Sequence, residues 1–216
     1  MIQVITVERE YGSGGADFAH HLAERLGWKL IDTCVIDDVA RQAGVAPTLV
    51  KRFDEQVDPW LHRFGKAIWL GSLERLPGDP DVFDSERMVE CMRIYFQEQA
   101  AKGKCVVVGR GAACVLSKAP GAFHVFVYAS MPRKVRFIQE RFPDHFKDAE
   151  KEIEATDRRR AEFIRRYHQR EWDDRRLYHL MMNSCMGMNA MVEAAIVAAG
   201  LKSQVPAMEP ARQAVG

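Results

Sequence analysis

A short β-type run at the start of the chain leads directly into a glycine-rich segment. Residues 2–7 read Ile-Gln-Val-Ile-Thr-Val, residues 9–15 read Arg-Glu-Tyr-Gly-Ser-Gly-Gly, and a helical pattern follows. Glycines can adopt the positive φ values that turn successive backbone N–H groups toward one point, and a helix N-terminus adds partial positive charge there. The segment therefore predicts a strand, a phosphate cradle and a helix. The cradle residues are Arg9, Tyr11, Gly12, Ser13, Gly14, Gly15 and Ala16.

The end of this cradle differs from the usual phosphate-binding loop. That loop finishes in Gly-Lys-Ser/Thr, whereas the matching positions here are Gly14, Gly15 and Ala16. The lysine and the metal-facing hydroxyl are therefore missing. A tight strand-to-helix connection that binds nothing is the alternative interpretation of the same glycines. The position at the first strand–helix junction, preceded by Arg9, favours phosphate.

Short apolar runs alternate with helical patterns along the rest of the chain. Strands are predicted over 2–7, 29–32, 105–108, 123–128 and 178–183, and helices over 17–26, 35–43, 85–101, 133–141, 147–167 and 188–199. This alternation is typical of an α/β fold, in which helices cover both faces of a parallel sheet. Ligands of such sheets bind beyond the carboxyl ends of the strands. The glycine segment, Asp32 and the Gly109-Arg110-Gly111 turn fall at those ends.

The chain of 216 residues is long enough for one domain with an inserted part. We expect a single domain over residues 1–200. Within it, proline and glycine interrupt the helical pattern of residues 45–80, which we interpret as a helical covering region, and residues 145–176 form an arginine-rich lid region. The last stretch, 201–216, has two prolines and little periodicity and is expected to be a disordered tail.

The charge balance argues against a polyanionic partner. Lys and Arg total 31 against 30 Asp and Glu, so the net charge of +1 gives no reason to expect nucleic acid or an anionic membrane. Five widely spaced cysteines with no Cys-x-x-Cys pair argue against a disulfide framework or a zinc site, and we predict no protein metal ligands. No long apolar run or leader pattern is present, so we expect a cytoplasmic protein.

Arginines are the other candidate phosphate ligands. Arg110 stands between two glycines directly after an apolar strand, which puts a planar fork of donors at the mouth of the sheet; a salt bridge at a turn is the alternative. Arg133 and Arg136 open a helix after a core strand, and either could be merely exposed.

A dense group of arginines follows Asp157 at helical spacing. Several of them could converge on a polyphosphate, although a solvated charged face is the commoner outcome for such a run. Tyr167, Trp172 and the lack of a matching acidic block favour a lid. The candidates are Arg158, Arg160, Arg165 and Arg166. His20 and His21, by contrast, are neighbours on a helix, so we expect them to face different directions and to be structural.

Taken together, these pieces resemble the cytidylate kinase-like family, a branch of the P-loop nucleoside monophosphate kinases. They occur in the family's order across residues 2–199, and the loop without lysine is similar to that of this branch. The segments that carry the resemblance are Arg9-Glu10-Tyr11-Gly12-Ser13-Gly14-Gly15, Leu30-Ile31-Asp32, Val107-Val108-Gly109-Arg110-Gly111-Ala112, Phe126-Val127-Tyr128-Ala129-Ser130 with Arg133 and Arg136, Asp157-Arg158-Arg159-Arg160-Ala161, and Trp172-Asp173-Asp174 through Asn183-Ser184.

The resemblance implies a P-loop NTPase-like three-layer α/β/α fold and transfer of the ATP γ-phosphoryl group, with Mg²⁺, to a nucleoside monophosphate such as CMP or dCMP. The cradle residues would bind ATP. Asp32, Arg110, Arg136 and Asp157 would bind the acceptor, and Arg158, Arg160, Arg165 and Arg166 would serve catalysis. Phosphoryl transfer depends on positioning and charge neutralisation, so arginines with Mg²⁺ can replace a missing lysine.

Two other functions stay open. A regulatory module that binds nucleotides without transfer fits Gly15 and Ala16 in the loop. A kinase of another small molecule fits the region after Asp32, which reads Thr-Cys-Val-Ile-Asp-Asp where cytidylate kinases have an arginine. The expected partners are nucleotide substrates rather than nucleic acid or membrane, and the oligomeric state is not predicted.

Overall fold

The structure, a computed structural model, describes residues 1–32, 85–141 and 148–202. The helix predicted over 35–43 and the covering region predicted over 45–80 lie outside the described residues, as does most of the tail predicted over 201–216.

Five parallel strands form one sheet in the order β2-β3-β1-β4-β5. The strands are β1 (Val4–Arg9), β2 (Lys29–Ile31), β3 (Cys105–Val108), β4 (Ala122–Tyr128) and β5 (Leu180–Asn183). The strand β3 is a continuous apolar run, and β1 and β4 are buried along most of their length, because both faces of the sheet are covered, as is usual for parallel sheets. The α/β class and the parallel sheet are confirmed.

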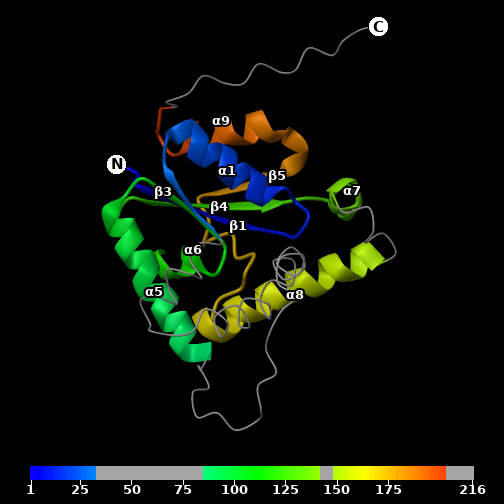
Figure 1. The fold of residues 1–216 in the computed structure, drawn as a ribbon, viewed down its shortest axis with the longest axis horizontal. Coiled ribbons are helices and arrows are strands. Elements are labelled where there is room, and N and C mark those ends of the chain that lie inside the picture. Colours follow the sequence, from blue (N-terminus) through cyan, green and yellow to red (C-terminus); the bar gives the residue numbers. More distant parts are fainter. Residues whose placement is uncertain (33–84, 142–147, 203–216) are drawn as a thin grey trace, which may run out of the picture.

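Helices cover both faces of this sheet, as Figure 1 shows. One face carries α1 (Gly15–Leu26) and α9 (Met188–Ala198), which share a core with Ile5 and Val7. The other carries α5 (Ser85–Lys102), α6 (Ala112–Val115) and α8 (Ala149–His168). The helix α7 (Met131–Arg141) packs on α8, and a 3-10 turn, η2 (Ser184–Met186), precedes α9. This arrangement confirms the three-layer α/β/α fold.

The helix α1 illustrates how the sequence pattern builds a layer. Phe18 and Leu22, four residues apart, are completely buried against the sheet. Gly27 ends the helix in the left-handed region at φ 61°, where its N–H donates to the carbonyl oxygens of the last turn. The predicted helix and its glycine stop are confirmed.

The carboxyl end of β1 meets the ends of its two neighbours. The Gly109 N–H donates to the Val7 carbonyl at 2.9 Å, and the Glu10 N–H donates to the Val127 carbonyl at 3.0 Å. The glycine loop after β1 and the Gly109 turn after β3 therefore lie at one edge of the sheet. The strand itself runs two residues later than predicted because Arg9 still pairs with Val127.

No helix in the described part of the chain is long and apolar enough to cross a membrane.

Candidate phosphate-binding site

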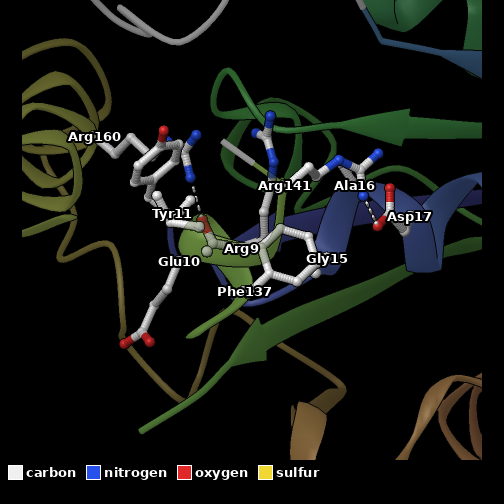
Figure 2. A pocket seen from close by; sticks show the side chains of 12 residues that line it. Arg9, Glu10, Tyr11, Gly15, Ala16, Asp17, Phe137, Arg141 and Arg160 are labelled. Carbon is white, nitrogen blue, oxygen red and sulfur yellow. Dashed lines mark hydrogen bonds and ion pairs between the residues drawn. The ribbon is translucent and has the colours of Figure 1, made fainter. Parts of the chain in front are cut away.

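An open hollow of about 480 Å³ lies over the glycine loop (Figure 2). It contains every predicted cradle residue except Ser13, and it also brings in residues of α7 and α8 that the loop pattern alone did not indicate. The lining consists of Arg9, Glu10, Tyr11, Gly12, Gly14, Gly15, Ala16, Asp17, Phe137, Ile138, Arg141 and Arg160.

The loop has the backbone geometry that a phosphate cradle requires. Gly12 and Gly14 both adopt φ 77°, and Gly14 is the N-cap residue of α1. A Cβ atom on Gly12 would lie 3.0 Å from the Lys134 carbonyl oxygen, which is tighter than an ordinary contact, and the positive φ disfavours a side chain as well. Ser13 is buried: its hydroxyl donates to the Glu10 carbonyl at 2.8 Å and accepts from the Gly15 N–H at 3.3 Å. Ser13 therefore stabilises the loop conformation through hydrogen bonds within the loop and does not line the hollow.

The helix α8 is fixed to this loop by two side chains. Arg160, only 8% exposed, donates to the Arg9 carbonyl at 2.8 Å, and its guanidinium lies 5.9 Å from the ring centre of Tyr11 (Figure 2). Asp157 accepts a 2.7 Å hydrogen bond from the Tyr11 N–H. Two of the candidates from the arginine-rich segment therefore reach the loop.

Lys134 of α7 is a site residue that sequence reasoning missed. Its ammonium group lies 3.0 Å from Asp157 Oδ2 and 3.1 Å from Glu10 Oε2, and the residue is 6% exposed. Burial alone would lower the pKa of Lys134, but these two carboxylates outweigh it and raise that pKa above its ordinary value. In the sequence this lysine looked like an ordinary surface residue in the first turn of a helix; only the core strand that ends at Tyr128, a few residues earlier, indicated otherwise.

The turn after β3 is held by a buried carboxylate that the sequence analysis also missed. Glu8, 3% exposed, accepts from the Gly111 N–H at 3.1 Å and from the Trp172 indole N–H at 3.3 Å. Burial raises the pKa of Glu8, although Arg9, Trp172 and Arg160 act in the opposite direction. An acid near the end of a strand whose other residues are mostly apolar is the signal that could have identified it.

Arg110 sits in this turn with a strained backbone. Its φ is 57°, between Gly109 at 68° and Gly111 at 73°. A left-handed conformation is unfavourable for an arginine and is concentrated at functional positions. His168 packs on the same turn: its Nε2 is buried without a hydrogen-bond partner among the described residues, and burial lowers the pKa of His168. A Cβ atom on Gly111 would lie 2.3 Å from that Nε2, so the turn requires glycine there.

The remaining candidates lie away from the hollow in this conformation. Arg158, Arg165, Arg166 and Arg136 are exposed. Arg165 pairs with Glu171 at 2.9 Å. Asp32 follows β2 at the edge of the sheet, separated from β1 by β3. The structure thus brings Asp157 and Arg160 to the loop and leaves the other predicted roles without a contact there.

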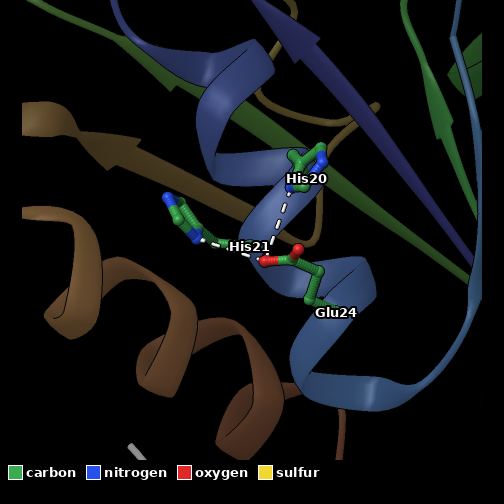
Figure 3. A group of neighbouring side chains, drawn as sticks. All are labelled: His20, His21 and Glu24. Atoms are coloured by element: carbon green, nitrogen blue, oxygen red, sulfur yellow. Dashed lines mark ion pairs between the residues drawn. The ribbon is translucent and has the colours of Figure 1, made fainter. Parts of the chain in front are cut away.

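The rings of His20 and His21 extend from α1 in different directions, yet both reach the same glutamate (Figure 3). Both Nδ1 atoms approach the same Glu24 oxygen, at 3.5 and 3.6 Å, because residues three and four positions apart share a helix face (Figure 3). The ligand atoms of the three residues lie within 4.8 Å of one another, close enough to share a cation. The side chains are 44–60% exposed, however, and ordinary surface pairing on α1 accounts for the cluster.

The residues present fit a nucleotide phosphate better than they fit a directly bound magnesium ion. The two left-handed glycines supply the cradle. Ala16 has no hydroxyl for the metal, and the carboxylates beside the loop are ion-paired: Glu10 and Asp157 with Lys134, and Asp17 with Arg141 at 2.6 Å. Mg²⁺ would accordingly reach this site through the phosphates and water.

A glycine loop between the central strand and its helix, in a parallel sheet of order β2-β3-β1-β4-β5, defines the fold of the P-loop kinases. The model of the cytidylate kinase-like family matches residues 4–185. The chain therefore belongs to the cytidylate kinase-like family, as the sequence predicted.

Solved structures support the fold. An uncharacterized protein from Eubacterium ventriosum ATCC 27560 is 20% identical with a TM-score of 0.67, covering 93% of this chain and 99% of that one. Shikimate kinase from Bacteroides thetaiotaomicron is 12% identical with a TM-score of 0.54, covering 93% and 100%. A gluconokinase from Sinorhizobium meliloti 1021 is 15% identical with a TM-score of 0.51, covering 92% and 91%. No curated protein matches the chain significantly.

Proposed function

We propose that the protein transfers the γ-phosphoryl group of ATP to a nucleoside monophosphate, with CMP or dCMP as the acceptor. The observation that carries this proposal is the hollow over the glycine loop, which combines left-handed Gly12 and Gly14 with the α1 N-terminus and a buried arginine, Arg160. Membership of the cytidylate kinase-like family supports phosphate transfer in general and suggests the acceptor.

In this proposal the loop binds the donor and the Arg110 turn binds the acceptor. The N–H groups of residues 12–15 would surround the ATP phosphates. Arg110 would bind the acceptor phosphate, and its strained backbone, fixed by Glu8, would keep the guanidinium in place. Asp32 and Arg136 keep their predicted part in acceptor binding.

Arg160 and Asp157 act on the loop. Arg160 anchors the loop through the Arg9 carbonyl and places its charge beside the cradle. The contacts of Asp157 with Tyr11 and Lys134 favour a positioning role over the acceptor contact first expected. The exposed Arg158, Arg165 and Arg166 would neutralise the transferring group only if α8 moved toward it.

The protein groups supply position and charge rather than covalent chemistry. Mg²⁺, when bound to the donor phosphates, would neutralise part of the charge that develops during transfer. Arg110 and Arg160, which the fold holds in place, would neutralise the rest of the charge. These donors need no rearrangement at the moment of reaction. We also propose that the protein is cytoplasmic, which fits its five widely spaced cysteines, and that its partners are nucleotides. A net charge of only +1 gives no reason to expect a nucleic-acid partner.

A coupled ADP-release assay with Mg·ATP and a panel of CMP, dCMP, UMP, AMP and GMP tests this function. We expect turnover with CMP or dCMP above all others. Arg110→Ala should raise the KM for the acceptor about tenfold or more, since a charge-assisted contact is lost. Unchanged KM and kcat in that variant would remove Arg110 from acceptor binding, and turnover with no member of the panel would contradict the acceptor class.

A regulatory protein that binds nucleotides without transfer is the second candidate function. Gly15 and Ala16, in place of the lysine and hydroxyl of the usual loop, favour it. Calorimetric binding of ATP and CMP by a protein that releases no ADP would establish this alternative.

A further inference from the structure

Gly15 has no room for a side chain because Arg9 occupies it. A Cβ atom on Gly15 would lie 2.4 Å from Cβ and 3.0 Å from Cγ of Arg9, and 3.2 Å from Cβ of Val127 on the neighbouring strand. The first of these separations is far shorter than two carbon atoms tolerate. A lysine at position 15 therefore cannot coexist with the present position of Arg9.

Arg9 cannot easily move aside. Its residue is the last of β1 and pairs with Val127 in β4, while its carbonyl accepts the hydrogen bond from Arg160. The atom nearest to Gly15 is Cβ, which is fixed by the backbone and not by a side-chain rotamer. The glycine at position 15 is thus a consequence of the arginine at position 9.

The usual loop has the opposite arrangement at these two positions. In the pattern Gly-x-x-x-x-Gly-Lys-Ser/Thr, the first glycine corresponds to Arg9 and the lysine corresponds to Gly15. The chain therefore has a cation where the pattern has a glycine, and a glycine where the pattern has a cation. The loop therefore keeps one long basic side chain, but it belongs to Arg9 at the start of the loop instead of to position 15 at its end.

The guanidinium of Arg9 extends from the loop to the turn after β3. A Cβ atom on Gly109 would lie 2.1 Å from Nη1 of Arg9, so the guanidinium rests directly on that glycine, next to Arg110. The Arg9 side chain also lines the hollow over the loop (Figure 2). Its positive charge consequently lies between the phosphate cradle and the proposed acceptor arginine.

We propose that Arg9 takes over the task of the missing loop lysine and binds the terminal phosphates of a nucleoside triphosphate. This inference rests on the proposed function for the identity of the ligand. A guanidinium can bind two phosphate oxygens at once, so it holds both position and charge. The exchange also explains why the loop retains a cradle without its lysine.

Reversing the exchange is the sharpest test. Arg9→Ala should weaken the calorimetric binding of Mg·ATP about tenfold or more, whereas Arg9→Lys should retain part of it. Gly15→Lys alone should also weaken binding, because the new side chain collides with Arg9. The double variant Arg9→Gly with Gly15→Lys should bind ATP more tightly than Gly15→Lys alone and more tightly than Arg9→Ala. Arg93→Ala, an exposed arginine of α5 paired with Glu90, is the matched control and should bind ATP as the wild type does.

Binding is measured separately from turnover, so the two proposals can fail independently. If ATP binding depends on Arg9 as stated but no acceptor is phosphorylated, the inference about Arg9 holds and the kinase proposal fails. If Arg9→Lys and Arg9→Ala both bind ATP like the wild type, or if the double variant binds no better than Gly15→Lys, the inference is overturned. Thermal melting of each variant verifies folding. If Arg9→Ala does not fold, the inference is decided by whether the double variant binds ATP more tightly than Gly15→Lys and whether Arg9→Lys binds ATP more weakly than the wild type.

Discussion

The Asp157 carboxylate accepts a 2.7 Å hydrogen bond from the Tyr11 backbone N–H, although 146 positions separate the two residues. The contact joins the arginine-rich helix α8 to the start of the phosphate loop. Lys134 makes it possible, because its ammonium group compensates the charge of Asp157 and of Glu10 at a largely buried position. Loop, α7 and α8 are thus fixed to one another by charge.

Removing Lys134 should therefore destabilise the protein strongly. Lys134→Met leaves two carboxylates beside the loop without their cation, and we expect the free energy of unfolding to fall by about 3 kcal/mol. Urea denaturation measures this loss. Lys151→Met is the matched control: Lys151 pairs with Asp148 on the exposed surface of α8, and its loss should cost less than about 0.5 kcal/mol. Equal effects of the two substitutions would show that the buried pairs do not stabilise the loop.

Glu8 should control acceptor binding from a distance. Glu8→Ala removes the acceptor of the Gly111 N–H and of the Trp172 indole, so the turn that carries Arg110 loses its anchor. We expect the affinity for the nucleoside monophosphate to fall about tenfold while ATP affinity stays within about twofold. Calorimetry with each nucleotide measures both. Trp172→Phe, which removes one of the two hydrogen bonds, should have a smaller effect; a uniform loss of both affinities would indicate general unfolding instead.

Arg160→Ala should reduce turnover. The substitution removes the 2.8 Å hydrogen bond to the Arg9 carbonyl together with a buried positive charge beside the cradle. We expect kcat/KM for ATP to fall about tenfold or more, since a charge-assisted hydrogen bond is worth roughly 1.5–3 kcal/mol. Steady-state kinetics with the preferred acceptor gives the value. If the kinetics of this variant equal those of the wild type, Arg160 has a structural role and does not contribute to turnover.

His124 should make the stability of the fold depend on pH. Burial, and secondarily the neighbouring His179, lowers the pKa of His124 to about 4; its Nδ1 lies 2.8 Å from the Thr6 hydroxyl. Between about pH 6.5 and pH 4 the unfolded chain binds a proton that the folded protein excludes, so stability falls as the pH falls through this window. The loss from this residue should reach about 3 kcal/mol.

Denaturant titrations of wild type and His124→Gln between pH 7 and pH 4 measure this effect. The difference in stability between the two proteins should shrink as the pH falls, because only the wild type loses the contribution of a neutral His124. A constant difference across that range would contradict the low pKa.

The layers of the fold could be predicted from the sequence because each depends on a local pattern. Apolar runs such as residues 105–108 form strands, and the spacing of Phe18 and Leu22 gives α1 its buried face. The strand order could not be predicted, because it depends on contacts between distant segments such as Val7 with Val108 and with Val125.

The residues of the candidate site also fall into two groups: those with a local signal in the sequence and those that depend on contacts between distant segments. The glycines of the loop are a local signal at one strand–helix junction, so the sequence could indicate the loop and its left-handed turns, while phosphate binding there stays a prediction. Glu8 and Lys134 act through partners far away along the chain, Gly111 for the one and Asp157 for the other, so neither has a local signature. Among the arginines after Asp157, helical spacing alone could not distinguish the buried Arg160 from the exposed Arg165. Only the packing of α8 on the loop separates the two.

Phosphoryl transfer by this protein can be followed with a radioactive label on the transferred group. The protein is incubated with γ-³²P-labelled Mg·ATP and CMP, and the products are separated by thin-layer chromatography. We expect the label to move from ATP to CDP, and Arg110→Ala to slow the transfer. Label that remains in ATP with CMP and also with dCMP, while calorimetry shows that the nucleotides bind, would contradict the kinase assignment and favour the regulatory alternative.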